Sequence, residues 1–171
     1  MKVNKRNPII HFLQCTIQHY DPDRYWRYRA KVMSPRQSKM QLALNYVRLM
    51  YIKWCDAFNN ASLGTDIGRG AYFESVPDFP HGLNGIIVNP NSSIGKNARI
   101  FHQVTIGDLG RGEFDAPTIG DNVTIGAGAK ILGKIHIGNN VTISAGAIVV
   151  EDVPDKASVV GPKARIILNS E

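Results

Sequence analysis

The feature that most constrains this chain is an aliphatic side chain that recurs every six residues over two runs, one ending at Ile106 and the other beginning at Ile119. A small or β-branched residue stands four positions after most of these aliphatics, and glycine often follows them directly. The repeated positions are Val88, Ile94, Ile100, Ile106, Ile119, Ile125, Ile131, Ile137, Ile143 and Val149.

This period predicts a coil of short strands with one buried face. Side chains alternate between the faces of a strand, so the aliphatic and the small residue four positions later point the same way. A glycine after the aliphatic suits a tight bend. One short strand and one bend in every six residues describe a prism with three flat sides, whose coils stack about 4.8 Å apart. Ordinary β-hairpins would need turns such as Asn-Gly, and they do not explain a strict period of six.

The first 60 residues lack the repeat and are predicted to form an N-terminal helical segment. Asp21-Pro22 and Ser34-Pro35 are helix-start signals, since each pairs a capping side chain with a ring that the first turn tolerates. A loose apolar stripe predicts the packed face of the second of these helices: Leu42, Tyr46, Leu49, Ile52 or Lys53, and Phe58. Arginines of the first helix are expected to face water. Helices here would cover the open end of the prism, where a bare coil would expose unpaired backbone groups.

We assign residues 61–171 to the β-helix domain. Ile67–Gly70 is interpreted as its first repeat, and Tyr72–Pro80 as an interruption because its prolines oppose regular ladder pairing. A second interruption at about 108–117 is rich in glycine and charge, and it is predicted to leave the prism and return. Function tends to reside in such excursions from a regular solenoid.

Charge is concentrated in the helical segment. Residues 1–58 contain eleven Lys and Arg against three Asp and Glu. A nucleic-acid partner is not expected, because no nucleic-acid-binding motif accompanies this charge, and contact with a membrane is left open. The two cysteines, Cys15 and Cys55, form no spaced cluster, which favours a reducing cytoplasm and argues against a metal site. No stretch has the roughly 18 apolar residues of a membrane span.

Two of the five histidines are candidates for catalysis. His81 follows the first interruption, and His102 lies two residues after Ile100, near the edge of a prism face. The other three, His11, His19 and His136, are interpreted as structural or solvent-exposed.

Three segments resemble the coenzyme A-binding coils of hexapeptide-repeat acyltransferases: PTIGDNVTIGAGAKILG, SAGAIVVEDVP and GPKARII. HGLNGIIVN, which begins at His81, resembles the segment that carries the general-base histidine in serine acetyltransferases and in related acetyltransferases of polysaccharide biosynthesis. The resemblance implies a mainly β fold, a left-handed parallel β-helix of hexapeptide repeats with an N-terminal α-helical segment. It also implies a homotrimer that uses acetyl-CoA as acyl donor, without a metal, and binds coenzyme A between two subunits.

The resemblance gives the candidate residues their roles. His81 would deprotonate an acceptor hydroxyl, since imidazole has an unperturbed pKa near 6.5 and a general base contributes roughly 10² to 10⁴ in rate. His102 stands where the family usually has glutamine, and it would be a second base or an acceptor contact. The carboxylate that would orient His81 is left open among Asp66, Glu74 and Asp78. Small residues would admit the pantetheine arm and basic residues would bind phosphates; these are Gly107, Gly126, Ala127, Gly128 and Ala145, and Lys130, Lys163 and Arg165.

The acceptor substrate is predicted from a position at which this sequence differs from the serine acetyltransferases. Serine acetyltransferases carry an Arg-His pair before Pro-Thr-Ile-Gly, whereas this chain has Asp115-Ala116, whose aspartate would repel a carboxylate. We therefore expect an O-acetyltransferase acting on a sugar or glycan hydroxyl, with serine O-acetyltransferase as the alternative. A non-catalytic β-helix scaffold is the alternative of another class. A zinc carbonic anhydrase would need three histidine ligands, and the spacing of the histidines does not supply them.

Overall fold

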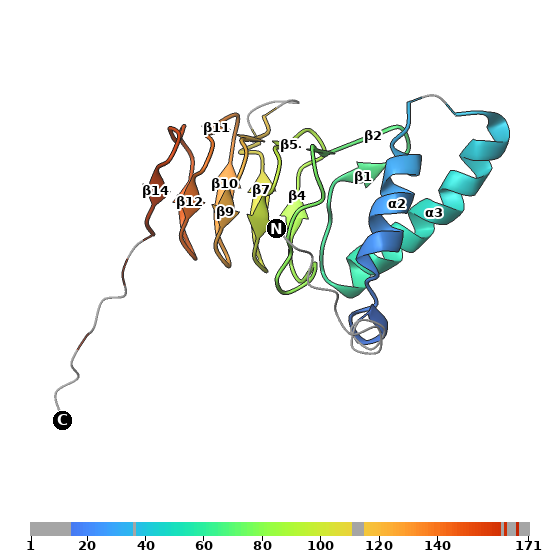
Figure 1. Ribbon diagram of the computed structural model, residues 1–171, viewed down its shortest axis with the longest axis horizontal. Helices are drawn as coiled ribbons and strands as arrows, with labels where there is room; N and C mark the ends of the chain where they lie inside the picture. The colour runs from blue at the N-terminus through green and yellow to red at the C-terminus, as the bar shows by residue number, and fades with distance from the viewer. Residues whose placement is uncertain (1–14, 36, 111–114, 162, 164–166, 168–171) are drawn as a thin grey trace.

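Three parallel sheets form a triangular prism that is covered at one end by helices (Figure 1). The computed structural model describes residues 15–35, 37–110, 115–161, 163 and 167. Each sheet of the prism has four strands, and the spatial orders are β13-β10-β7-β4, β11-β8-β5-β3 and β14-β12-β9-β6. Successive strands along the chain belong to different sheets, so three strands make one coil.

The strands are short. Their bounds are β3 (Tyr72–Phe73), β4 (Ile87–Val88), β5 (Ser93–Ile94), β6 (Arg99–Ile100), β7 (Thr105–Gly107), β8 (Thr118–Ile119), β9 (Thr124–Ile125), β10 (Lys130–Leu132), β11 (His136–Ile137), β12 (Thr142–Ile143), β13 (Ile148–Val149) and β14 (Ser158–Val159).

The predicted aliphatic column is confirmed. Ile131 pairs in register with Ile106 on one side and with Val149 on the other. All ten repeated aliphatics are at most 3% exposed. The core is therefore a continuous stack along the prism axis, and each coil buries its aliphatics against those of the coils above and below.

Two corners of the prism use left-handed backbone conformations. At one corner Asn97, Asn122 and Asn140 have φ values of 56°, 57° and 57°. Their amides form a ladder, because Asn97 Nδ2 donates to Asn122 Oδ1 (3.1 Å) and Asn122 Nδ2 donates to Asn140 Oδ1 (3.3 Å). The ladder links three coils at this corner.

The second corner, which we call the glycine corner, has positive φ at Gly85, Gln103, Gly128 and Gly146 (66°, 60°, 70° and 68°). It joins the sheet containing β6 and β9 to the sheet containing β7 and β10. The chain passes from β6 to β7 through His102, so this corner carries one of the candidate histidines.

Two predictions about the first coil are wrong. Ile67–Gly70 is not a repeat, because β1 (Thr65–Asp66) and β2 (Arg69–Gly70) pair antiparallel as a hairpin. Tyr72–Pro80 is not wholly an interruption, because β3 pairs with β5 and Asp78 forms a parallel bridge with Arg99. The backbone N–H groups of Glu74 and Asp78 donate to the next coil, so the prolines of this segment fall at positions that need no donor.

The second interruption lies at one corner, between β7 and β8. Its described ends are tied down: Asn89 Nδ2 donates to Asp108 Oδ2 (2.7 Å), and the Leu109 N–H donates to Asp115 Oδ2 (3.0 Å). Residues 111–114 lie outside the described part of the chain.

Helix α2 (Pro22–Val32) begins where predicted, with Asp21 Oδ1 accepting from the Arg24 N–H (3.1 Å). Helix α3 (Lys39–Phe58) begins later than predicted. Its N-cap is Ser38, because the Ser38 side chain and the Gln41 side chain satisfy each other's backbone N–H groups.

The predicted packing stripe of α3 is right at Ile52, which is buried, and at Leu49, which packs against the core, but it is wrong at Tyr46 and Phe58, which are exposed. The buried side of α3 is completed by Asn45, Cys55 and Asp56. No helix among the described residues is long and apolar enough to cross a membrane.

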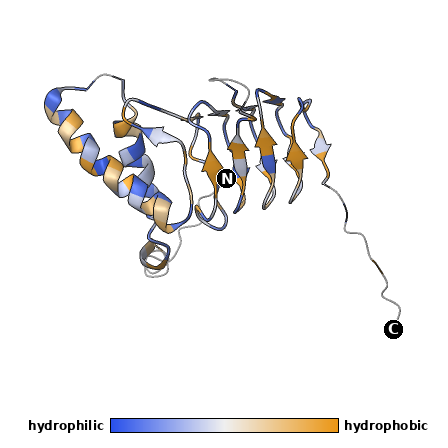
Figure 2. Cartoon of the chain, turned by 180° about the vertical axis from the view of Figure 1, so that it is seen from behind, coloured by the Kyte–Doolittle hydropathy of each residue, from blue (hydrophilic) through white to orange (hydrophobic). Residues whose placement is uncertain are grey.

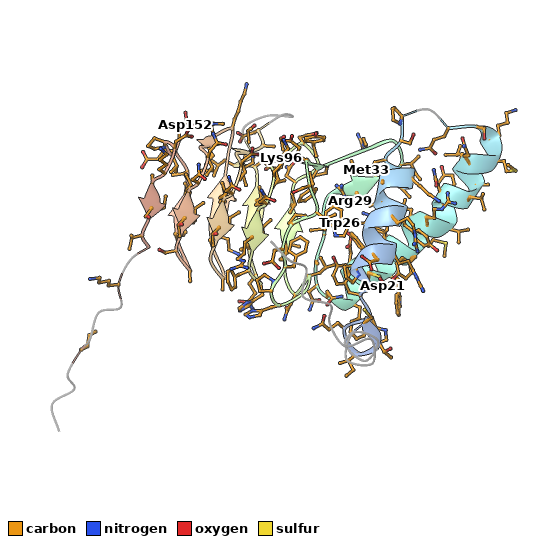
Figure 3. The ribbon with its side chains drawn as sticks, viewed as in Figure 1. Asp21, Trp26, Arg29, Met33, Lys96 and Asp152 are labelled. Carbon is orange, nitrogen blue, oxygen red and sulfur yellow. The ribbon has the colours of Figure 1, made fainter. Side chains whose placement is uncertain are left out.

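Arg29 joins the helices to the prism, contrary to the expectation that the arginines of α2 face water. It is buried, and it donates from Nε to Thr65 Oγ1 (2.9 Å) and from Nη2 to the Leu63 carbonyl (3.2 Å). In Figure 3 its side chain and that of Trp26 extend from α2 toward the first strands. Burial lowers the pKa of Arg29 to about 10. The end of the prism is thus closed by a hydrogen-bonded helix, as the need to cover a terminal coil predicts.

Candidate active site

The structure brings His81 and His102 together. His81 lies in the turn that precedes β4, and His102 lies in the glycine corner after β6. Their Nδ1 atoms are 2.7 Å apart, and their ring centroids are 4.7 Å apart with a tilt of 42°. The His81 ring also stands edge-on to Phe101, with centroids 5.6 Å apart. His81 is exposed and His102 is half-buried, so a substrate from solvent can reach the pair.

The short Nδ1–Nδ1 distance constrains the protonation of both rings. Two ring nitrogens in hydrogen-bond contact need one donor and one acceptor. If His81 Nδ1 donates, His81 Nε2 keeps its lone pair, and His102 carries its hydrogen on Nε2. In that arrangement His102 does for His81 what a carboxylate does in a catalytic triad, because it fixes the tautomer and the ring orientation.

The three carboxylates considered as partners of His81 are engaged elsewhere. Each forms an ion pair: Asp66 Oδ2 lies 3.7 Å from Arg69 Nη2, Glu74 Oε1 lies 2.9 Å from Lys96 Nζ, and Asp78 Oδ2 lies 2.8 Å from Arg99 Nε. Within the described residues, no carboxylate is bonded to either imidazole. His102 is therefore the polar group that the fold supplies to His81.

Four of the five small residues predicted to bind coenzyme A gather at the glycine corner: Gly126, Ala127, Gly128 and Ala145. The Gly128 N–H donates to the His102 carbonyl (3.0 Å), and the Gly146 N–H donates to the Ala127 carbonyl (2.9 Å). A Cβ at Gly126 would lie 2.4 Å from the backbone nitrogen of Ala145, so coil stacking by itself requires glycine there. A Cβ at Gly128 would meet nothing within 4 Å, so the space beside Gly128 is open.

The basic residues differ in their placement. Lys130 Nζ donates to the Gln103 carbonyl (3.1 Å) and to Thr105 Oγ1 (2.9 Å), which puts its charge at the glycine corner. Lys163 is exposed beyond β14, and no hydrogen bond or ion pair engages it within the described part of the chain. Arg165 lies outside the described residues. The remaining small residue predicted to contact coenzyme A, Gly107, ends β7 on the prism face next to this corner.

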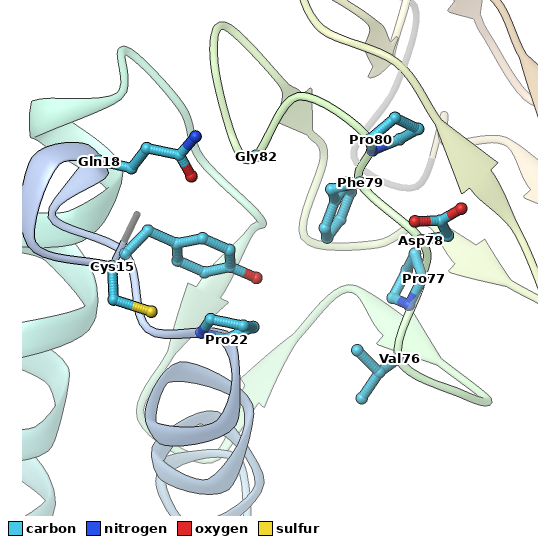
Figure 4. A pocket seen from close by; sticks show the side chains of 10 residues that line it. Cys15, Gln18, Pro22, Val76, Pro77, Asp78, Phe79, Pro80 and Gly82 are labelled. Carbon is cyan, nitrogen blue, oxygen red and sulfur yellow. The ribbon is translucent and has the colours of Figure 1, made fainter. Parts of the chain in front are cut away.

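A cavity of about 220 Å³ lies next to His81 along the chain (Figure 4). The two neighbours of His81, Pro80 and Gly82, line it. Asp78 is the one charged residue of its lining in the part of the chain that the structure describes. The remaining lining residues are Cys15, Gln18, Tyr20, Pro22, Val76, Pro77 and Phe79.

Sequence reasoning missed the part that the N-terminal segment plays in this cavity. Gln18 lies against Gly82, since a Cβ at that glycine would be 3.2 Å from Gln18 Oε1. No periodicity or motif marks Gln18 or Tyr20. The proline-bearing segment before His81 was the one available signal that the chain departs from the prism here. Among the described residues, no cluster of three or more His, Cys, Asp or Glu side chains is suited to hold a metal ion.

Comparison with known proteins gives a consistent result. Residues 116–150 match the family model described as bacterial transferase hexapeptide (six repeats). The serine acetyltransferase of Helicobacter pylori is 40% identical over 107 residues, which are 61% of this chain and 57% of that protein. The serine acetyltransferase of Mycobacterium tuberculosis is 39% identical over 115 residues, 67% of this chain and 50% of that protein. The chain thus spans about half the length of the curated relatives it matches.

Solved structures agree. Soybean serine acetyltransferase apoenzyme superposes with a TM-score of 0.65 at 29% identity, over 95% of this chain and 63% of that chain. The Neisseria gonorrhoeae serine acetyltransferase superposes with a TM-score of 0.59 at 33% identity, over 77% of this chain and 50% of that one. The prism is a left-handed parallel β-helix of hexapeptide repeats, and the predicted resemblance to the acetyltransferases of this fold is confirmed.

Proposed function

Since the chain carries hexapeptide transferase repeats and is similar to serine acetyltransferases, we propose that it is an acetyl-CoA-dependent O-acetyltransferase with His81 as general base. The observation that carries the proposal is the 2.7 Å contact between His81 Nδ1 and His102 Nδ1. That contact orients an exposed imidazole beside a corner with open space at Gly128.

In the proposed reaction, His81 Nε2 takes the proton of the acceptor hydroxyl as the oxygen attacks the thioester carbonyl. The His81 Nδ1–H donates to His102, which stabilises the imidazolium that forms. Backbone N–H groups of the corner would stabilise the oxyanion. When the carbon–sulfur bond breaks, the leaving thiolate of coenzyme A takes this proton from His81. The step uses no metal.

Acetyl-CoA, the acyl donor, is proposed to lie along the glycine corner. The observations that support a contact with it differ from residue to residue. Lys130 supplies a positive charge beside His102, although its ammonium already donates to Gln103 and Thr105. Lys163 is exposed, and it would contribute a positive charge for a phosphate. We retain the full set as proposed contacts of acetyl-CoA: Gly107, Gly126, Ala127, Lys130, Ala145, Lys163 and Arg165. A homotrimer, in which a second subunit would complete this site, is proposed from the family resemblance, and light scattering of the purified protein tests it.

L-serine is the acceptor that the relatives support, because those named above are serine acetyltransferases. This reverses the order predicted from the sequence, which placed a sugar first. The sugar hydroxyl remains as a second candidate on two observations. Among the described residues, the lining of the cavity beside His81 has Asp78 and no Lys or Arg to hold a carboxylate, and Asp115-Ala116 replaces the basic pair of the serine enzymes.

The test is release of free thiol from acetyl-CoA with L-serine and with a panel of sugars and nucleotide sugars. We expect His81→Ala to lower kcat by roughly 10² to 10⁴ while coenzyme A still binds. His102→Gln, which can still accept from His81 Nδ1, should lower kcat less than His102→Ala does. His136→Ala is the matched control, since His136 is exposed on a different strand, β11.

The acceptor that drives thiol release decides between serine and sugar. Full activity of His81→Ala would refute the assignment of the base. Failure of the wild-type protein to bind coenzyme A or release thiol with any acceptor would instead favour the non-catalytic scaffold.

A further inference from the structure

Helix α3 turns an apolar face to solvent. Six large apolar side chains on it are between 48% and 74% exposed. They define what we call the α3 outer face: Met40, Leu44, Val47, Met50, Trp54 and Phe58. Spacings of three and four residues place them on one side of the helix. Single exposed apolar residues are common on protein surfaces, but a continuous row of this size marks an interaction surface.

This face is not the side of α3 that packs within the chain. The opposite side carries the buried residues, among them Ile52 and Asp56, which face α2 and the first strands. Figure 2 shows α3 at the end of the molecule away from the last coil, with hydrophobic positions along it. A helix of 20 residues is about 30 Å long, so the row extends over much of that end.

The exposed charges of α3 itself have one sign. The one acidic residue of α3, Asp56, is buried, whereas Lys39 and Lys53 are exposed. Arg24 of α2 lies with its guanidinium 5.6 Å from the centre of the Tyr51 ring, and the Tyr51 ring is 6.4 Å from Trp54. Arg24 is paired with Asp21 (Nε to Oδ2, 3.9 Å), so the cations that no exposed carboxylate of α3 balances are Lys39 and Lys53.

We propose that the α3 outer face binds the surface of an anionic lipid bilayer. Its composition is that of an interfacial helix, with Trp, Phe, Leu and Met on the apolar side and Lys at the border. Anionic headgroups would supply the negative charge that the helix lacks, and the Trp54 ring suits the boundary between headgroups and acyl chains. A second copy of the chain fits less well, because two such faces would bring Lys39 and Lys53 toward like charges. This inference is independent of the proposed acetyl transfer.

Vesicle flotation tests the proposal with the full chain. Wild-type protein should float with vesicles of equal parts phosphatidylglycerol and phosphatidylcholine, and much less with phosphatidylcholine alone. Binding should weaken as salt is raised, because salt screens the lysines and arginines. Met50→Glu should weaken binding at least about tenfold, because it puts a negative charge into the α3 outer face, which would be buried in the bilayer.

Val160→Glu is the matched control. Val160 and Met50 are both 72% exposed, but Val160 follows β14 at the other end of the prism. It should bind vesicles as the wild type does. Equal binding to both kinds of vesicle, or unchanged binding of Met50→Glu, would overturn the proposal. A drop in the oligomer mass of Met50→Glu in lipid-free light scattering would also overturn it, by assigning the face to a second copy.

Discussion

Asp56 offers a quantitative test of how the helices are packed. It is 3% exposed, and its Oδ1 accepts a hydrogen bond from the Tyr25 hydroxyl (2.7 Å). Burial raises the pKa of Asp56 to about 6, although the Tyr25 hydrogen bond and the charges of Lys53 and Arg29 oppose the rise. The folded protein therefore holds this proton more tightly than the unfolded chain, in which an aspartate has a pKa of about 3.9.

The sign of the pH dependence follows. Protonation of Asp56 stabilises the fold fully below about pH 4, and this contribution is lost as the pH rises through about 6. A gap of about two pKa units corresponds to about 3 kcal/mol in the free energy of unfolding. At pH 8 the folded protein thus carries a buried charge that costs about this amount.

Asp56→Asn removes the charge and keeps an oxygen that accepts from Tyr25. We expect the variant and the wild type to be similar near pH 4, and the variant to become more stable by up to about 3 kcal/mol at pH 8. Urea unfolding at several pH values, with equal protomer concentrations, measures the difference. Other titrating groups are common to both proteins and cancel, and Asp23→Asn, at an exposed position on α2, should show no such trend.

A constant difference between Asp56→Asn and wild type from pH 4 to pH 8 would refute this reasoning. It would mean that water or another donor solvates the Asp56 carboxylate in solution. The helices would then be less tightly closed over the prism than the structure indicates.

Three further changes test the packing of the prism, each by its urea midpoint. Ile131→Ala should cost about 2–5 kcal/mol because it empties a site in the aliphatic column, while Ile148→Ala, 67% exposed, should cost less than about 0.5 kcal/mol. Gly120→Ala should lower the midpoint because its Cβ would lie 2.7 Å from Asn139 Oδ1. Arg29→Ala should cost several kcal/mol because it leaves the buried acceptors of the guanidinium without a donor.

The prism was predictable because one rule fixes nearly all of it. Three repeats of six residues make one coil, so the pairing of Ile131 with Val149, 18 residues later (149 − 131), follows from counting. The pairing of Ile131 with Ile106 spans 25 residues (131 − 106) and could not be counted, because the loop between β7 and β8 adds residues to that coil. The same rule fails where a local alternative exists. Ser38 and Gln41 form a capping box that outweighs the Ser34-Pro35 signal, and the turn at Ile67-Gly68 closes a hairpin in place of a coil.

The individual histidines of the candidate site could be predicted from the sequence, but the contact between them could not. Each histidine could be selected from its segment, but their contact joins residues 21 positions apart across the irregular first coil. Among the described residues, none of the three carboxylates considered for His81 bonds to it, because Asp66, Glu74 and Asp78 each pair with a nearby lysine or arginine. Gln18 reaches the cavity through the packing of the N-terminal segment, which no repeat encodes.

The two left-handed corners together indicate where a ligand has room. Both impose nearly the same backbone, yet one corner is occupied by asparagines, as at Asn122 (φ 57°), and the other by glycines at Gly128 (φ 70°) and Gly146 (φ 68°). Asparagine adopts this conformation readily, so the backbone alone does not require glycine beside His102. Gly128→Asn should therefore fold with little loss of stability, while its side chain enters the space proposed for acetyl-CoA. We expect a raised KM for acetyl-CoA and an unchanged urea midpoint; an unchanged KM would place the donor elsewhere on the prism.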